Sequence, residues 1–217
     1  MKVLAIDVGG THVKILVAGQ KEKRQFDSGP NLGPSEMVMG VKELASGWDY
    51  DVVSIGYPGP VKDDQPEADP FNLGPGWVKF DFAKAFGCPV KVINDAAMQA
   101  LGSQEGGKML FLGLGTGLGT AMVVDGTVLP MELGHLPYRK KTFEDYVGLR
   151  GLKRLGKKKW QKHVVIAVEK FFAALQPEYV VLGGGNVNKL KKLPAGCRRG
   201  ENENAFVGGF RLWESKN

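Results

Sequence analysis

The hydrophobic residues of this chain fall into short aliphatic and β-branched runs, and the clearest runs come in pairs joined by glycine. Residues 3–6 and 13–17 form one pair, and residues 110–114 and 121–124 form the other. Runs of this length bounded by glycine are typical of β-strands, so each pair predicts two strands joined by a tight turn. The two turns, Gly9-Gly10-Thr11 and Gly115-Thr116-Gly117, are similar in sequence, which indicates that each opens an α/β unit of its own.

Further elements are expected after each pair. In the first half the pattern predicts a strand at 22–26, a helix at 35–45, strands at 51–55 and 90–93, and a helix that begins at Asn94-Asp95. In the second half it predicts a strand at 127–129, two helices separated at Gly156, a strand at 180–182 and a closing helix at 205–213. Hydrophobic residues recur at helical spacing over 164–175, which predicts core packing. The stretch 56–79 contains five prolines and predicts a long irregular loop, of a kind that is usually either a binding loop or disordered.

These elements predict an α/β fold of two lobes with a cleft between them. The N-terminal lobe is expected at 1–105, with the helix at 205–217 packing back on it, and the C-terminal lobe at 106–204. A length of 217 residues, 43% of them hydrophobic, allows one large domain or two lobes of about 100 residues each. No apolar run approaches the ~20 residues of a membrane span and no signal-peptide pattern opens the chain, so we expect a cytoplasmic protein with no membrane partner.

The net charge is +6, and the excess of basic residues lies in the second half of the chain. Such clusters indicate either solvated helix faces or a site for a polyanionic partner, and the charge pattern leaves both interpretations open. No helix-turn-helix, zinc-finger or RNA-binding signature accompanies them, so nucleic acid is not the expected partner. Cys88 and Cys197 are far apart and have no CxxC partner, which argues against a disulfide framework or a structural zinc site.

The glycine turns are the first candidate chemistry. Glycine allows positive φ and exposes backbone N–H groups to an anion, so a Gly-Thr turn predicts a cradle for phosphate. Asp7, just before the first turn, is expected either to bind magnesium through water or only to close the strand end.

Asn94-Asp95 is the second candidate, because a carboxylate at the end of a strand and the start of a helix lies where α/β proteins bind ligands. It is kept ionised by the helix dipole, so it could accept a proton from a substrate hydroxyl, but Asn and Asp are also common helix caps. Glu132, His135 and Glu144 suit a hydroxyl-rich sugar, although surface polar groups look the same in sequence. His12 and His163 are expected to be structural or solvated.

The order of motifs resembles the ROK family of sugar kinases, which have the hexokinase and actin-like (ribonuclease H-like) fold. The residues that carry the resemblance cover nearly the whole chain: Ile6-Asp7-Val8-Gly9-Gly10-Thr11, Gly56-Tyr57-Pro58-Gly59-Pro60-Val61, Asn72-Leu73, Gly76-Trp77, Val92-Ile93-Asn94-Asp95-Ala96, Gly113-Leu114-Gly115-Thr116-Gly117-Leu118-Gly119, Glu132-Leu133-Gly134-His135 and Val181-Leu182-Gly183-Gly184-Gly185. The resemblance implies that Asp95 is the general base. It implies a sugar site made of Asn72, Asn94, Glu132, His135 and Glu144, and a site for the phosphoryl donor with Mg²⁺ at Asp7. The donor site would comprise Asp7, Gly9, Gly10, Thr11, Lys14, Gly115, Thr116, Gly117, Gly183 and Gly184.

One departure from the family pattern changes the expectation. Most members carry a cysteine cluster that binds zinc after the Glu-x-Gly-His element, whereas residues 136–142 contain no cysteine, so we expect no zinc. The branch without this cluster that is similar to the chain is the polyphosphate glucokinases, by Leu155-Gly156-Lys157-Lys158-Lys159-Trp160 and by residues 206–213. A track for polyphosphate is then expected along Lys153, Arg154, Lys157, Lys158, Lys159 and Lys162.

The expected activity is phosphorylation of the 6-hydroxyl of glucose by a homodimer that uses polyphosphate or ATP with Mg²⁺. Three alternatives remain: an ATP-dependent kinase for mannose, fructose or an N-acetyl sugar, a non-catalytic sugar sensor, and an actin-like assembly protein. A regulator with a DNA-binding module before the first turn is not expected, since that turn starts at residue 9.

Overall fold

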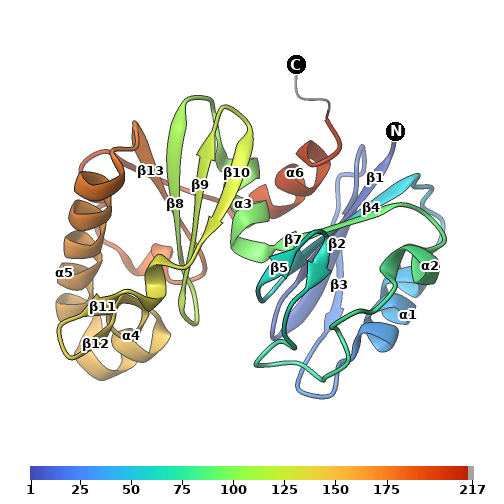
Figure 1. Ribbon diagram of the computed structural model, residues 1–217, viewed down its shortest axis with the longest axis horizontal. Coiled ribbons are helices and arrows are strands. Elements are labelled where there is room, and N and C mark those ends of the chain that lie inside the picture. Colours follow the sequence, from blue (N-terminus) through green and yellow to red (C-terminus); the bar gives the residue numbers. More distant parts are fainter. Residues whose placement is uncertain (215–217) are drawn as a thin grey trace. The chain divides into compact units, whose positions relative to one another are not determined.

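The structure is a computed structural model that describes residues 1–214 and divides into two compact units (Figure 1). The first unit comprises Met1–Met98 together with the chain from Ala205 onward, and the second comprises Gln99–Asn204. Each unit is built on one five-stranded sheet. The helix α3 (Asp95–Ser103) begins in the first unit and ends in the second.

The sheet of the first unit has the order β3-β2-β1-β4-β7. Its strands are β1 (Val3–Val8), β2 (His12–Val17), β3 (Arg24–Asp27), β4 (Val52–Tyr57) and β7 (Val90–Asn94). Strands β1, β4 and β7 are parallel, and β2 and β3 are antiparallel to their neighbours. The predicted strands are therefore present, with the third one shifted from 22–26 to Arg24–Asp27.

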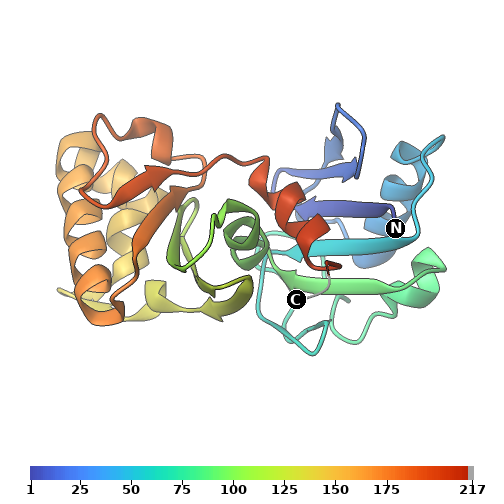
Figure 2. The ribbon, with the colours of Figure 1, turned by 90° about the horizontal axis from the view of Figure 1, so that it is seen from above.

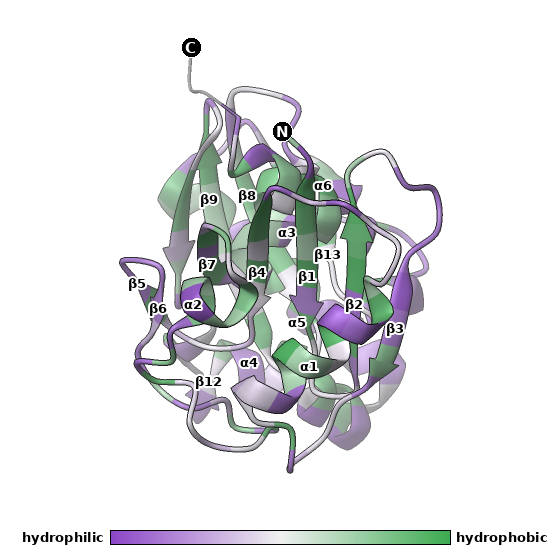
Figure 3. Cartoon of the chain, turned by 90° about the vertical axis from the view of Figure 1, so that its right-hand side faces the viewer, coloured by the Kyte–Doolittle hydropathy of each residue, from purple (hydrophilic) through white to green (hydrophobic). Residues whose placement is uncertain are grey.

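The two faces of this sheet are covered by different helices. Leu4, Ile6 and Ile55 face a core that includes residues of α1 (Pro34–Leu44) and α2 (Phe82–Phe86). Figure 3 shows the hydrophobic colouring along β1 and β4. The alternate residue Ser54 faces α6 (Asn204–Arg211), where its Oγ donates a hydrogen bond of 2.6 Å to Gly209 O. Figure 2 shows α6 lying along β4, so the closing helix packs on the first sheet.

The proline-rich stretch 56–79 is an ordered loop. It contains a small hairpin of β5 (Val61–Lys62) and β6 (Gln65–Pro66), whose turn residues Asp63 and Asp64 both have positive φ. Asp69 Oδ1 accepts hydrogen bonds from Gly76 N (3.0 Å) and from the backbone of the buried Trp77 (2.8 Å). The loop therefore has fixed internal bonding, and the alternative of disorder was wrong.

The sheet of the second unit has the order β10-β9-β8-β13-β14 and repeats the arrangement of the first sheet. Its strands are β8 (Lys108–Leu114), β9 (Leu118–Val124), β10 (Thr127–Met131), β13 (Tyr179–Gly183) and β14 (Cys197–Arg199). Strands β8, β13 and β14 are parallel, and the β8–β9–β10 part is antiparallel. In both units, a glycine turn thus connects the central strand to an antiparallel neighbour.

A long helix, α5 (Leu149–Leu175), packs on this second sheet through Trp160, Val164 and Phe171. The predicted break at Gly156 is present as a kink, with φ 73° and ψ 157°. These angles lie in a region that essentially only glycine adopts, which explains glycine at this position. The helical spacing of 164–171 reflects core packing, as predicted.

Several short elements were not predicted from the sequence. They are α2, α4 (Phe143–Val147), η1 (Leu133–His135), β11 (Pro137–Tyr138), β12 (Lys141–Thr142), η2 (Val187–Lys189) and β14. Each has five residues or fewer, which is too short to display a hydrophobic period. Within residues 1–214, no helix combines the length and hydropathy needed to cross a membrane.

Candidate active site

The first glycine turn joins β1 to β2 and is held by local hydrogen bonds. Gly9 N donates to His12 O (3.0 Å), and Ser28 Oγ donates to Gly9 O (2.6 Å). Neither Gly9 nor Gly10 has a positive φ, so this turn does not use the left-handed backbone that glycine allows. Close approach explains the glycines: a Cβ at Gly9 would lie 3.0 Å from His12 O, and one at Gly10 would lie 3.3 Å from the Asn72 Cβ.

The parallel strands bring Asp7 and the Asn94-Asp95 pair to the same edge of the first sheet. The register pairs Asp7 of β1 with Gly56 of β4, and Tyr57 of β4 with Asn94 of β7. The carboxyl ends of parallel strands form the edge at which α/β proteins bind ligands. A Cβ at Gly56 would clash with the Met98 methyl group of α3, so glycine here lets α3 start close to the end of β4.

Asp7 is a half-buried carboxylate with one basic neighbour. Its Oδ2 lies 3.5 Å from Lys14 Nζ, and the two side chains are 22% and 29% exposed. Burial raises the pKa of the Asp7 carboxyl, and the Lys14 ammonium partly opposes this shift. A partly desolvated carboxylate beside a turn of backbone N–H groups suits Mg²⁺, which proteins hold through one or two carboxylates and the phosphates of the substrate.

Asn94 and Asp95 have different local roles. Asn94 Oδ1 accepts a hydrogen bond from Ala97 N (3.1 Å), and Asn94 Nδ2 donates to Gly59 O (3.1 Å). Asn94 is therefore the N-cap of α3. Asp95 is the first residue of the helix, half-buried, with Oδ1 2.7 Å from Ala96 N. Both side chains thus accept from N–H groups of the first turn of α3, Asn94 from Ala97 N and Asp95 from Ala96 N, and only Asn94 Oδ1 bonds the N–H three residues on as a typical N-cap does.

The second glycine turn is held from two sides within its own unit. Leu149 N, at the start of α5, donates to Gly115 O and Thr116 O at 3.1 Å each. Asn186 donates through its backbone N to Leu114 O and through Nδ2 to Gly115 O, both at 2.9 Å. Sequence reasoning missed Asn186, because an asparagine after three glycines is typical of any turn.

Close approach also explains Gly117 and Gly184, whereas a Cβ at Gly115 would meet no atom within 4 Å. Gly115 and Gly117, like Gly9 and Gly10, have no positive φ. Gly184, which follows β13, does have a positive φ of 79°, and a Cβ there would lie 2.7 Å from Leu114 backbone atoms. Gly183 is in register with Gly113 of β8, so the predicted residues Gly183 and Gly184 adjoin the second turn.

Glu144 lies against the second turn. A Cβ at Gly117 would be 2.5 Å from Glu144 Oε2, while Glu144 Oε1 accepts a hydrogen bond of 3.1 Å from Arg150 Nη2. The Glu144 side chain is 24% exposed. Arg150 was not predicted to belong to this region, because an arginine at the start of a basic helix carries no distinguishing sequence signal.

Glu132 and His135 are exposed and lie near each other, with Oε2 and Nδ1 3.6 Å apart. Their segment is tied to β9 by Thr120, whose Oγ1 donates to Met131 O (2.7 Å) and accepts from Leu133 N (3.1 Å). Thr120 is buried and was missed, since a hydroxyl inside a strand gives no motif. The second unit therefore presents Glu132 and His135 on a fixed backbone.

The expected basic track is not one uniform surface. Lys153, Arg154, Lys157, Lys158, Lys159 and Lys162 are all exposed. Arg154 differs in that its guanidinium donates to Asp145 O (2.8 Å) and lies over the Tyr146 ring at 5.1 Å. Arg154 therefore contacts α4 of its own unit.

The remaining histidines have structural partners. His163 Nδ1 lies 3.0 Å from the Tyr138 hydroxyl, and burial lowers the pKa of His163, with Arg139 and Arg154 acting in the same direction. His12 Nε2 lies 3.4 Å from Asp27 Oδ1. Among the residues that the structure describes, no three His, Cys, Asp or Glu side chains form a group that could hold a metal ion.

The two repeated α/β units with glycine turns define the fold of the actin-like and hexokinase class. Residues 3–147 match the model of the ROK family, and the chain belongs to this family. The polyphosphate glucokinase of Mycobacterium tuberculosis (strain ATCC 25618 / H37Rv) is 25% identical over 219 residues, covering 86% of this chain and 78% of that protein.

Solved structures agree on the fold. The inorganic polyphosphate/ATP-glucomannokinase from Arthrobacter sp. strain KM superposes with a TM-score of 0.82 at 23% identity, covering 96% of each chain. A ROK family glucokinase from Streptomyces griseus, in complex with glucose and AMPPNP, gives a TM-score of 0.77 at 16% identity over 98% of this chain and 99% of that one. The predicted family and fold class are thereby confirmed.

Proposed function

We propose that this protein is a glucokinase that transfers a phosphoryl group from polyphosphate or ATP to the 6-hydroxyl of glucose. The observation that carries the proposal is the position of Asp95, a half-buried carboxylate at the start of α3 and at the same edge of the sheet as Asp7, beside Asn94, which caps the helix through Ala97 N. The names of the similar proteins, a polyphosphate glucokinase and a polyphosphate/ATP-glucomannokinase, support this choice of sugar and donor.

In the proposed reaction, Asp95 accepts the proton of the 6-hydroxyl as the hydroxyl oxygen bonds to the terminal phosphorus of the donor. The bond from that phosphorus to the bridging oxygen breaks, and the leaving group, ADP or the polyphosphate chain shortened by one unit, keeps the electron pair. Such transfers depend mainly on positioning and on neutralising charge. Asp95 lies at the N-terminus of α3, where the helix dipole favours negative charge.

Asp7 is the proposed carboxylate for Mg²⁺, which would neutralise charge on the donor phosphates when bound. The backbone N–H groups of Gly9, Gly10 and Thr11 are proposed to bind phosphate, with Lys14 beside them. In the second unit the same role is proposed for Gly115, Thr116, Gly117, Gly183 and Gly184. Asn72, Asn94, Glu132, His135 and Glu144 are the proposed sugar ligands, because carboxylates, amides and imidazole can pair with vicinal hydroxyl groups.

An assay of purified protein with each donor and a panel of hexoses tests this proposal. We expect glucose 6-phosphate to form with Mg²⁺ and either long-chain polyphosphate or ATP, and no product to form with EDTA present. Mannose belongs in the panel because one structural relative is named a glucomannokinase. If only another hexose is phosphorylated, and only with ATP, the alternative of a different ROK hexose kinase holds. If the protein binds sugar without turnover, it is a sensor. A homodimer and a cytoplasmic location remain predictions.

A further inference from the structure

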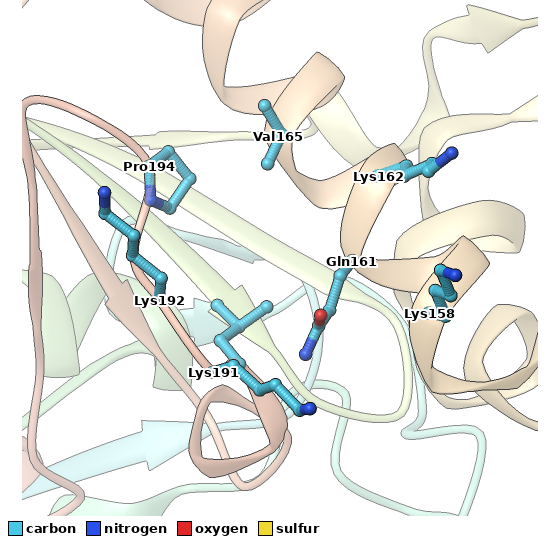
Figure 4. A pocket seen from close by; sticks show the side chains of 8 residues that line it. Lys158, Gln161, Lys162, Val165, Lys191, Lys192 and Pro194 are labelled. Carbon is cyan, nitrogen blue, oxygen red and sulfur yellow. The ribbon is translucent and has the colours of Figure 1, made fainter.

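A basic pocket lies in the second unit, between the middle of α5 and the segment after β13 (Figure 4). We call it the lysine pocket; its volume is about 280 Å³. Its lining residues are Lys158, Gln161, Lys162, Val165, Leu190, Lys191, Lys192 and Pro194. Two lysines come from α5 and two from the other wall, and Gln161 Nε2 joins the walls by a hydrogen bond of 2.8 Å to Lys189 O.

Both walls of the lysine pocket start at the second glycine turn. The α5 wall begins at Leu149, whose N donates to Gly115 O and Thr116 O. The other wall begins after Gly184, where Asn186 Nδ2 donates to Gly115 O. At ~1.5 Å per helical residue, Lys158 lies about 14 Å along α5 from Leu149, and the non-helical Gly156 between them adds a little to this path. The pocket is therefore a neighbour of the proposed phosphate-binding turn on the same unit.

The chemistry of the lining selects for a flexible polyanion. None of the four lysines forms an ion pair with a carboxylate in the part of the chain that the structure describes, and the lining includes no acidic residue. Like charges gathered without counter-charges repel one another, so a bound anion relieves this repulsion. The lining also has no aromatic side chain on which a nucleobase could stack, which disfavours single-stranded nucleic acid.

We propose that the lysine pocket binds phosphate groups of a linear polyphosphate chain at a distance from the reacting end, an inference that rests on the proposed function. A long chain spans both the second glycine turn and the pocket, whereas tripolyphosphate or ATP has too few phosphates to occupy both fully. The pocket then raises the affinity for long chains through additional charge contacts.

The geometry also divides the basic stretch of α5 into residues inside and outside the pocket. Lys158 and Lys162 are one helical turn apart and line the pocket, as do Lys191 and Lys192 opposite. Lys157 and Lys159 are also exposed but do not line it, so the pocket narrows the track expected from the sequence to Lys158 and Lys162 on this helix. The double substitution Lys157→Gln/Lys159→Gln is therefore a charge-matched control for Lys158→Gln/Lys162→Gln.

Binding of long-chain sodium polyphosphate, measured by titration calorimetry without glucose or magnesium, tests the proposal separately from catalysis. We expect Lys158→Gln/Lys162→Gln to raise the Kd about tenfold, since each exposed charge contact contributes modestly. Lys191→Gln/Lys192→Gln should reproduce the effect from the opposite wall. The control pair should change the Kd less than about threefold, and Kd for tripolyphosphate should change little in all variants.

Salt should weaken the binding of the parent protein more than that of the pocket variants, because the Debye length falls from ~10 Å at 0.1 M to ~3 Å at 1 M. Equal effects of the pocket and control pairs would overturn the proposal. Binding of transfer RNA with the same affinity and the same sensitivity to the pocket variants would also overturn it. If glucose is not phosphorylated with any donor while the pocket variants still lose polyphosphate binding, the proposed function fails and the binding site stands.

Discussion

The substitution Gly117→Ala moves Glu144 without removing it, and so tests whether the sugar site needs this carboxylate in its observed position. The new Cβ would lie 2.5 Å from Glu144 Oε2, whereas ordinary contact begins near 3.4 Å, so the carboxylate must shift by about 0.9 Å. The backbone permits alanine, because φ of Gly117 is not positive. The atom that must move is the end of a flexible side chain, and its partner Arg150 is exposed.

We therefore expect a small change in stability, within ~1 kcal/mol, and a shift in Tm of no more than ~4 °C. A displacement of this size in a substrate ligand is expected to raise the KM for glucose by roughly 10- to 100-fold. Initial rates of glucose 6-phosphate formation across a range of glucose concentrations measure this change. Calorimetric scans of the same preparations measure Tm.

Two further variants make the result interpretable. Gly115→Ala is the matched control in the same turn, because a Cβ there meets no atom within 4 Å, and its KM for glucose should stay within about twofold of the parent value. Glu144→Ala should raise the KM for glucose as much as Gly117→Ala does. The double variant should raise it little further, because both substitutions act on the same contact. An unchanged KM in both Gly117→Ala and Glu144→Ala would refute the role of Glu144.

Three other predictions concern the cap, the buried carboxylate and the metals. Asn94→Ala removes the cap of α3 and the bond to Gly59 O, so unfolding free energy should fall by about 1–3 kcal/mol and Tm by ~2–4 °C per kcal/mol in a thermal scan. Burial raises the pKa of Asp7, so the folded state is stabilised by this group below its ordinary pKa and loses that stabilisation as the pH rises through the raised pKa. Asp7→Asn should therefore raise Tm at pH 7 but not at pH 3, while activity falls. Equal Tm shifts at both pH values would contradict this prediction. Elemental analysis of protein prepared without chelator should find no stoichiometric zinc, and activity should require added Mg²⁺; one tightly bound zinc per chain would overturn the expectation drawn from residues 136–142.

The helices and strands that could be predicted from the sequence are those long enough to show a hydrophobic periodicity. The paired strands around each glycine turn and the helical repeat at 164–171 in α5 were predicted, because the hydrophobic periodicity and the bounding glycines extend over many residues. The conformation of the turns was not. Glycine at Gly9 and Gly117 serves close approach by His12 O and by the Glu144 carboxylate, and a single sequence does not distinguish this from a need for positive φ.

The candidate site shows the same limit. Asp7 and Asp95 could be proposed from their positions at strand ends. That Asn94 is the residue that caps α3 could be seen only in the structure, from the hydrogen bond that Ala97 N donates to it. The hydrogen bonds of Thr120 and Asn186 join segments that are distant in sequence, so no local sequence pattern predicts them. In the same way, the lysine pocket depends on Lys191 and Lys192 lying opposite α5, which charge counting along the chain cannot reveal.

The rate of glucose phosphorylation by Asp95→Asn, measured at saturating glucose and donor against the parent protein, tests the central claim most directly. The substitution is nearly isosteric, and the cap of α3 stays in place because Asn94 provides it. The account predicts an unchanged Tm, a KM for glucose within a few-fold of the parent value, and a kcat lower by roughly 10²- to 10⁴-fold, the span expected for loss of a general base. A kcat above about a tenth of the parent value would contradict it, because proton transfer would then require another group.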